Sequence, residues 1–119
     1  MSHHFVDLLE ELKSRLARMT ALVQQIVEQS VESVFNADAI IAQRAIDSDV
    51  RIDEEEVRVE KSAIDLLALY QPAAVDLRMI TTVIKVNSDF ERIADHCTNI
   101  AENVIYVASG KIIRHRHAG

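Results

Sequence analysis

Three observations predict an all-α protein that folds as an antiparallel three-helix bundle. Among 119 residues there are only two glycines and one proline, and apolar residues make up 49% of the chain. Apolar residues recur at alternating spacings of four and three over long segments. This period is that of an amphipathic helix that packs one face against a core. Short breaks near residues 36–38 and 71–72 divide the chain into three such segments. We therefore expect one domain, residues 1–119, that is large enough to bury a core.

The first helix is predicted over about residues 4–35. Its apolar side chains keep strict helical spacing: Phe5, Leu9, Leu12, Leu16, Met19, Val23 and Ile26. The break that follows contains Asn36 and Asp38, and either side chain suits the N-cap of the next helix. A turn this short makes the first two helices antiparallel neighbours.

The second helix, about residues 38–70, carries two stripes. One contains Ile41, Ala45, Ser48, Ile52, Glu55, Val59, Leu66 and Tyr70, and the other contains Ile46, Val50, Asp53, Val57, Glu60, Ile64 and Leu67. Both are apolar at their ends and acidic in the middle. The pair Gln71-Pro72 ends this helix, because proline disfavours helix in the residue before it.

The third helix, about residues 73–109, repeats this pattern. An unbroken apolar stripe runs through Met79, Val83, Val86, Phe90, Ile93, Cys97, Ile100, Val104 and Val107. A second stripe, with a polar middle, contains Ile80, Ile84, Asn87, Glu91, Ala94, Thr98, Ala101 and Ile105. Gly110 is expected to end the helix in a left-handed conformation, and a basic tail follows over residues 111–119.

Composition excludes several classes of function. The net charge of −6 argues against nucleic acid as a main partner. Both glycines, Gly110 and Gly119, lie at the C-terminal end, so no glycine-rich phosphate loop precedes them. The single Cys97 lies on an apolar stripe, as expected of a buried thiol in a reducing cytosol. No signal peptide or run of about 18 apolar residues is found, so we expect a cytoplasmic protein without membrane insertion.

Acidic pairs four residues apart mark the middle of the second and third helices: Asp49 with Asp53, and Glu91 with Asp95. Asp53 and Glu91 are almost equally far from the turn at Gln71-Pro72, so antiparallel helices bring the two pairs to similar heights. Such oxygen-rich clusters suit hard or borderline metal ions. The alternative is a purely structural role, with the acids solvated or neutralised by arginine and lysine. The metal candidates are therefore Asp49, Asp53, Glu91 and Asp95.

Catalysis is not expected. A di-metal carboxylate enzyme needs Glu-x-x-His on two helices, whereas Glu91 and His96 are five residues apart. No plausible Ser-His-Asp arrangement or reactive thiolate environment is present. The functional candidates are therefore a binding protein and a structural bundle.

Several motifs resemble the PhoU family of phosphate-uptake regulators. They are DVRID at residues 49–53, QPAAVDLR at 71–78, ERIADH at 91–96 and NIAE at 99–102. They occur in order and cover nearly the whole chain, which is similar to one of the two three-helix repeats usual in the family. Ala94 stands where the family pattern has glycine, and Cys97 where it has alanine.

The resemblance implies a regulator that couples a phosphate-specific ABC transporter to a membrane sensor histidine kinase. It also implies that the acidic motifs bind iron or zinc, with Asp49, Asp53, Glu91 and Asp95 as the ligands. Because each helix carries more apolar surface than a three-helix core consumes, we further expect a homodimer that forms a six-helix assembly.

Overall fold

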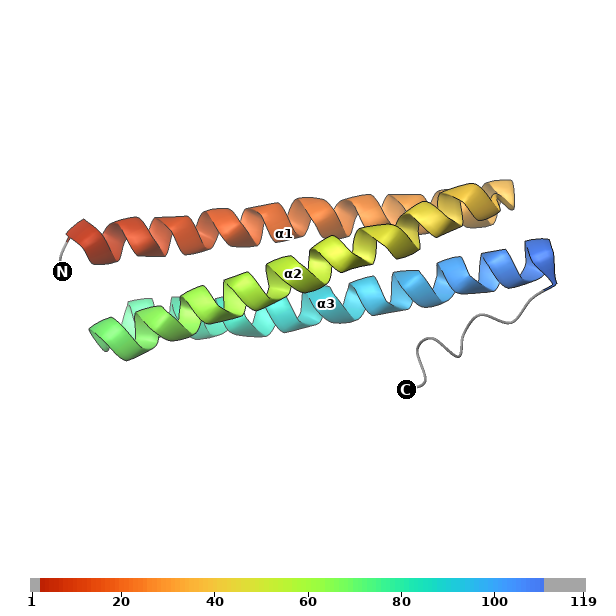
Figure 1. Ribbon diagram of the computed structural model, residues 1–119. Coiled ribbons are helices and arrows are strands. Elements are labelled where there is room, and N and C mark those ends of the chain that lie inside the picture. Colours follow the sequence, from red (N-terminus) through yellow and green to blue (C-terminus); the bar gives the residue numbers. More distant parts are fainter. Residues whose placement is uncertain (1–2, 111–119) are drawn as a thin grey trace.

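A computed structural model describes residues 3–110 of the chain. It contains three helices: α1 (His3–Asn36), α2 (Ala39–Tyr70) and α3 (Ala74–Ser109). They run antiparallel side by side, so the predicted all-α three-helix bundle is confirmed (Figure 1). The predicted basic tail, residues 111–119, lies outside the described residues.

The turns are built by the residues that the sequence indicated. Asp38 is the N-cap of α2, and its Oδ1 accepts hydrogen bonds from the backbone N–H of Ile40 at 2.9 Å and of Ile41 at 3.2 Å. Gln71 ends α2 with a φ of 43°, in the left-handed region. Gly110 ends α3 with a φ of 73°, which glycine adopts without the steric cost that a Cβ brings.

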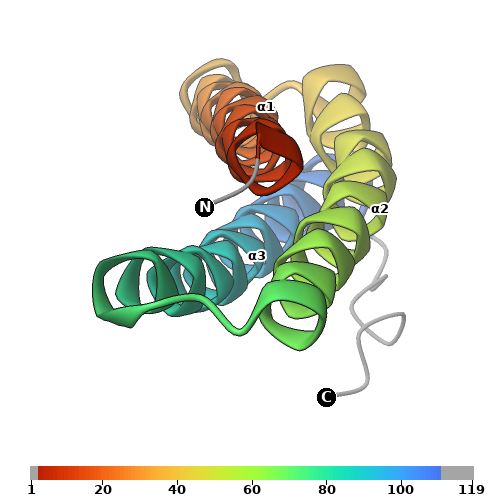
Figure 2. The ribbon, with the colours of Figure 1, turned by 90° about the vertical axis from the view of Figure 1, so that its left-hand side faces the viewer.

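Seen from one end, the three helices form a triangle, and α2 packs closely on both α1 and α3 (Figure 2). The contact between α1 and α3 is the least extensive of the three. Because the number of helices is odd, α1 begins at one end of the elongated bundle and α3 finishes at the other (Figure 1).

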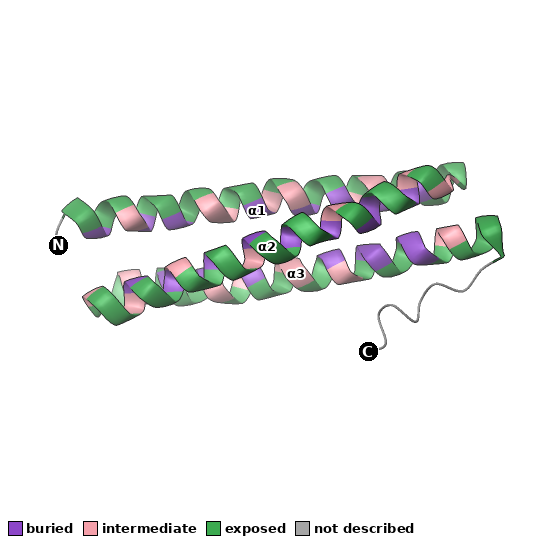
Figure 3. Ribbon diagram, viewed as in Figure 1, coloured by how far each residue is buried: buried purple, intermediate pink, exposed green. Residues whose placement is uncertain are grey.

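The hydrophobic core is divided into two clusters, one toward each end. The cluster near the α1–α2 turn contains Met19, Val23, Ile26, Ala42, Ala45, Ile46, Ile52, Ala94, Cys97 and Ala101. The cluster near the α2–α3 turn contains Phe5, Leu9, Leu12, Val59, Ala63, Leu66, Ile80 and Val83. Each helix turns one side toward this core, so buried and exposed residues alternate along every helix (Figure 3).

Polar side chains lie between the two clusters. On the α1–α2 side, the Oε1 of Glu55 lies 3.9 Å from Arg15 Nη1, and its Oε2 lies 3.5 Å from Arg58 Nη1. On the α2–α3 side, Asn87 Nδ2 donates a hydrogen bond of 2.9 Å to the backbone carbonyl of Glu56. Glu55 and Asn87 are both buried, so the bundle is held at its middle by polar contacts.

The structure also decides which stripe of each helix faces the core. On α2 it is the stripe that contains Ile52 and Val59, whereas Val57 and Ile64 on the other stripe are exposed. On α3 the stripe with the polar middle is the more buried of the two. The unbroken apolar stripe of α3 is buried only in part, and four of its residues are exposed: Met79, Ile93, Ile100 and Val107.

Candidate functional site

Four carboxylates approach one another at the middle of the bundle, two from α2 and two from α3. We call Asp53, Glu56, Glu91 and Asp95 the acidic cluster. The charges of Asp95, Glu56 and Asp53 all act on Glu91, and those of Asp53 and Asp95 act on Glu56. The antiparallel register about Gln71-Pro72 therefore brings the acids of the two helices together.

The four residues predicted as metal ligands differ in exposure. Asp53 is exposed, whereas Glu91 and Asp95 are half-buried. Asp49, one turn from Asp53, lies on the core side of α2 and is only 9% exposed. Glu56 was missing from the predicted ligands, although its spacing of three from Asp53 already placed it on the same side of the helix.

The proximity of these acids changes their protonation. Partial burial raises the pKa of Glu91 to about 7, and a side-chain hydrogen bond with Asp95 and the negative charges of Asp95, Glu56 and Asp53 add to the effect. Burial also raises the pKa of Glu56, followed by the charges of Glu60, Asp53 and Asp95. Near neutral pH, Glu91 is therefore partly protonated, and a cation placed among these acids would favour its ionised form.

Three of the basic residues that could neutralise the cluster pair with other acids. Arg58 lies within 4.0 Å of Glu54 and 3.5 Å of Glu55. Lys61 Nζ lies 3.1 Å from Asp65 Oδ2.

A third cation, Arg92, shows the same behaviour, since its Nη1 lies 3.8 Å from Asp89 Oδ1. Within residues 3–110, no lysine or arginine forms an ion pair with Glu56, Glu91 or Asp95. In this part of the chain, neutralisation by arginine or lysine therefore takes no form of an ion pair at these three acids, and the alternative of solvated acids remains.

Asn87 connects the polar middle to the cluster. It lies one turn before Glu91 on α3 and is 2% exposed. Its amide nitrogen donates a hydrogen bond to the backbone carbonyl of Glu56 on α2. Its Oδ1 is buried and has no hydrogen-bond partner among the described residues. A buried amide that joins two helices fixes their relative height, because shifting either helix would break the bond.

The donor chemistry of the cluster suits a hard cation, since every candidate ligand is a carboxylate oxygen. The geometry does not present a ready-made site, however. Among the described residues, no three His, Cys, Asp or Glu side chains are gathered closely enough to hold one metal ion. Metal binding by Asp49, Asp53, Glu91 and Asp95 thus stays a prediction, and it requires side chains to move.

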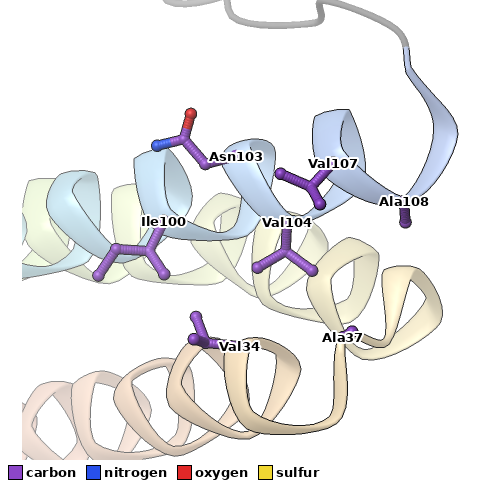
Figure 4. A pocket seen from close by; sticks show the side chains of 7 residues that line it. All are labelled: Val34, Ala37, Ile100, Asn103, Val104, Val107 and Ala108. Atoms are coloured by element: carbon purple, nitrogen blue, oxygen red, sulfur yellow. The ribbon is translucent and has the colours of Figure 1, made fainter.

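A second feature is an apolar opening of about 550 Å³ between α1 and α3, near the α1–α2 turn. Val34 from α1 faces Ile100 and Val104 from α3 across this opening (Figure 4). Val31, Ile93 and Val107 are exposed nearby on the same two helices. We call this surface the apolar face, and it lies between α1 and α3, the pair of helices with the least extensive contact.

No helix in the described part of the chain is both long enough and apolar enough to span a membrane.

Comparison with known proteins identifies the family. A model of the PhoU domain matches residues 16–104. A phosphate-specific transport system accessory protein PhoU homolog from Aquifex aeolicus is 41% identical over 84% of this chain and 45% of its own length. Homologs of the same description from Thermotoga maritima and Rhizobium meliloti are 35% and 37% identical, over 47% and 50% of their lengths. The chain spans about half the length of these curated relatives. It belongs to the PhoU domain family.

Proposed function

We propose that this protein is a regulator of phosphate transport that acts in the cytoplasm by binding other proteins. The observation that carries the proposal is the match to the PhoU domain over residues 16–104, because relatives with this domain are described as accessory proteins of a phosphate-specific transport system. A bundle that presents long helical faces is suited to binding, and no catalytic role is proposed for it.

The proposed partners are a phosphate-specific ABC transporter and its sensor histidine kinase. Binding would restrain phosphate uptake and keep the phosphate-starvation response switched off when phosphate is plentiful. The alternative is a helical adaptor or structural bundle for another transporter, in which the acids are purely structural. The lack of a ready-made three-ligand group within residues 3–110 favours this alternative for the acids.

Gene deletion tests the function. In phosphate-rich medium, the deletion strain is expected to express starvation genes and to take up phosphate without restraint, and the intact gene is expected to restore both. Restoration by a variant with Asp53→Asn and Glu91→Gln would mean that partner binding does not need a metal at these acids. Normal uptake and silent starvation genes in the deletion strain would leave only the adaptor interpretation.

We also propose that two copies of the chain associate through the apolar face. An aliphatic surface formed by Val34, Ile100 and Val107 is exposed to solvent at the opening between α1 and α3. Burying this surface in a dimer interface is favourable. Light scattering of the purified chain is expected to give a dimer, and Ile100→Asp is expected to give a monomer. Val6→Asp, at an exposed valine elsewhere on α1, is the control and should stay dimeric. A wild-type monomer at micromolar concentration would refute the proposal.

Metal binding is the remaining part of the proposal, with iron or zinc at Asp49, Asp53, Glu91 and Asp95. Elemental analysis of the purified chain tests occupancy directly. A bound metal also raises the melting temperature, because it stabilises only the folded state. The variant with Glu91→Gln and Asp95→Asn is expected to lose that rise, whereas Glu32→Gln on α1 should keep it. If the wild type shows no shift with iron, zinc, manganese or magnesium, the ligand assignment is wrong.

A further inference from the structure

One stripe of α2 is exposed although its pattern is that of a helix-packing surface. Val50, Val57 and Ile64 are spaced by seven residues and are 59%, 61% and 48% exposed. Asp53 and Glu60 follow the two valines by three residues each, so that the five side chains occupy the two seam positions of a heptad pattern. We call Val50, Asp53, Val57, Glu60 and Ile64 the α2 stripe. Neither α1 nor α3 covers it, since all five residues are exposed.

The α2 stripe contains a depression into which a side chain of another helix could insert. Val57, Glu60, Lys61 and Ile64 line a shallow depression of about 310 Å³. In a coiled-coil contact, each apolar seam residue of one helix inserts between four residues of the other. Spacings of three and four around this depression match the four-residue hole that such packing requires.

The α2 stripe itself carries two acids and no base, although Lys61 lines the depression beside Glu60. Asp53 and Glu60 lie on it, and Glu56, Glu91 and Asp95 lie beside it. Two of the neighbouring cations pair with other acids: Lys61 with Asp65, and Arg58 with Glu54 and Glu55. Among residues 3–110, Glu60 also has no lysine or arginine within ion-pair distance. A partner that brings positive charge opposite the two acids is therefore favoured at this surface.

This charge disfavours a second copy of the chain as the occupant. Pairing two α2 stripes would bring Asp53 and Glu60 of both copies into one seam, and like charges there select against such a pair. The apolar face lacks this restriction, because the residues that line its opening are uncharged. The two surfaces therefore suit different partners.

We propose that the α2 stripe docks an amphipathic helix of a partner protein that carries lysine or arginine opposite Asp53 and Glu60. Its aliphatic residues pack against Val50, Val57 and Ile64, and its cations also meet Glu91 and Asp95, the two α3 members of the acidic cluster. This inference rests on the proposed function as a protein-binding regulator and names the chemistry of the surface by which it binds. Complementary charge at the seam fixes orientation and excludes acidic helices.

The test uses the full chain and a labelled synthetic peptide of three heptads, with leucine at one seam position and lysine at the other. Fluorescence anisotropy is measured in a chelating buffer, so that no metal occupies the acids. The lysine peptide is expected to bind, and its Kd is expected to rise at least about tenfold with Asp53→Lys plus Glu60→Lys. A peptide with glutamate in place of lysine should bind this double variant better than the wild type.

Controls separate the seam from general charge attraction. Val57→Ser should weaken binding about threefold or more by removing an apolar contact, whereas Val6→Ser and Glu32→Lys, both exposed on α1, should leave Kd unchanged. A scrambled peptide of the same composition should bind weakly. The proposal is overturned if the lysine peptide does not bind, if the scrambled peptide binds equally, or if Glu32→Lys has the same effect as the double variant. Circular dichroism confirms that each variant is folded.

Complementation distinguishes this inference from the proposed function. If the deletion strain has normal phosphate control, the proposed function fails whatever the peptide does. If the deletion strain loses that control and Asp53→Lys plus Glu60→Lys restores it fully, the docking surface is wrong while the function stands. Loss of restoration by this double variant, but not by Glu32→Lys, is the result expected.

Discussion

Replacing Glu91 by glutamine should make stability depend less on pH. The pKa of Glu91 is raised from an ordinary 4.5 to about 7 in the folded chain, first by burial and then by Asp95, Glu56 and Asp53. Between these two pH values the folded chain binds a proton that the unfolded chain has released. The stabilisation is therefore fully present below about pH 4.5 and is lost as the pH rises through about 7.

The size of the effect follows from the same shift. A tenfold change in proton affinity corresponds to about 1.4 kcal/mol, so the rise from 4.5 to about 7 sets an upper limit of about 3 kcal/mol. Glu91 is still in contact with solvent, which screens the neighbouring charges, and we expect about 1–2 kcal/mol. Glutamine keeps a donor for the Asp95 carboxylate but cannot ionise. Glu91→Gln should therefore be more stable than the wild type at pH 8 by this amount and about equal to it at pH 4.5.

Urea unfolding followed by circular dichroism, at several pH values in chelating buffer, measures this difference. Comparing variant with wild type at each pH removes the titration of the acids that do not interact with Glu91. Glu32→Gln, at an exposed glutamate of α1, is the matched control and should follow the wild type at every pH. A difference between Glu91→Gln and wild type that does not change between pH 4.5 and pH 8 would refute the electrostatic reasoning, as would a loss of stability at pH 8.

Three further substitutions test the fold. Ile52→Ala removes a fully buried side chain of the core and should lower the free energy of unfolding by about 2–5 kcal/mol in chemical denaturation. Asp38→Ala removes the N-cap of α2 and should cost about 0.5–2 kcal/mol, whereas Asp38→Asn should keep most of the stability. Asn87→Ala breaks the bond to the Glu56 carbonyl and should cost about 1–3 kcal/mol, with faster amide hydrogen exchange near the middle of α2 and α3. An Asn87→Ala variant as stable as the wild type would show that the polar contact does not hold the helices together.

Much of the fold could be predicted because the relevant signals are local. Helical spacing, the cap at Asp38 and the break at Pro72 each depend on a few consecutive residues, and the structure confirms them. The meeting of Asp53 with Glu91 could also be predicted, since both lie almost equally far from the α2–α3 turn. Once two helices are joined by a short turn, counting residues fixes their relative height.

The rotation of each helix could not be predicted in this way. Both stripes of α2 and both of α3 are apolar at their ends, and only contacts with distant residues decide which stripe is buried. Glu55 is buried because Arg15 approaches it from α1, forty residues earlier, and Asn87 is buried because it binds the Glu56 carbonyl. Asp49 and Asp53 looked equivalent at a spacing of four. A helix turns about 40° beyond a full circle over four residues, so one carboxylate lies toward the core and the other outside.

The odd number of helices has a consequence for how the bundle can be extended. α1 begins at one end of the bundle and α3 finishes at the other (Figure 1). A helix that followed Gly110 after a tight turn would have to run back along α3, as α2 runs back along α1. A further up-down-up unit attached there would start beside the α1–α2 turn and point opposite to the first. Strict alternation of direction would then hold through all six helices without a crossover connection, and tandem units would lie side by side in opposite senses.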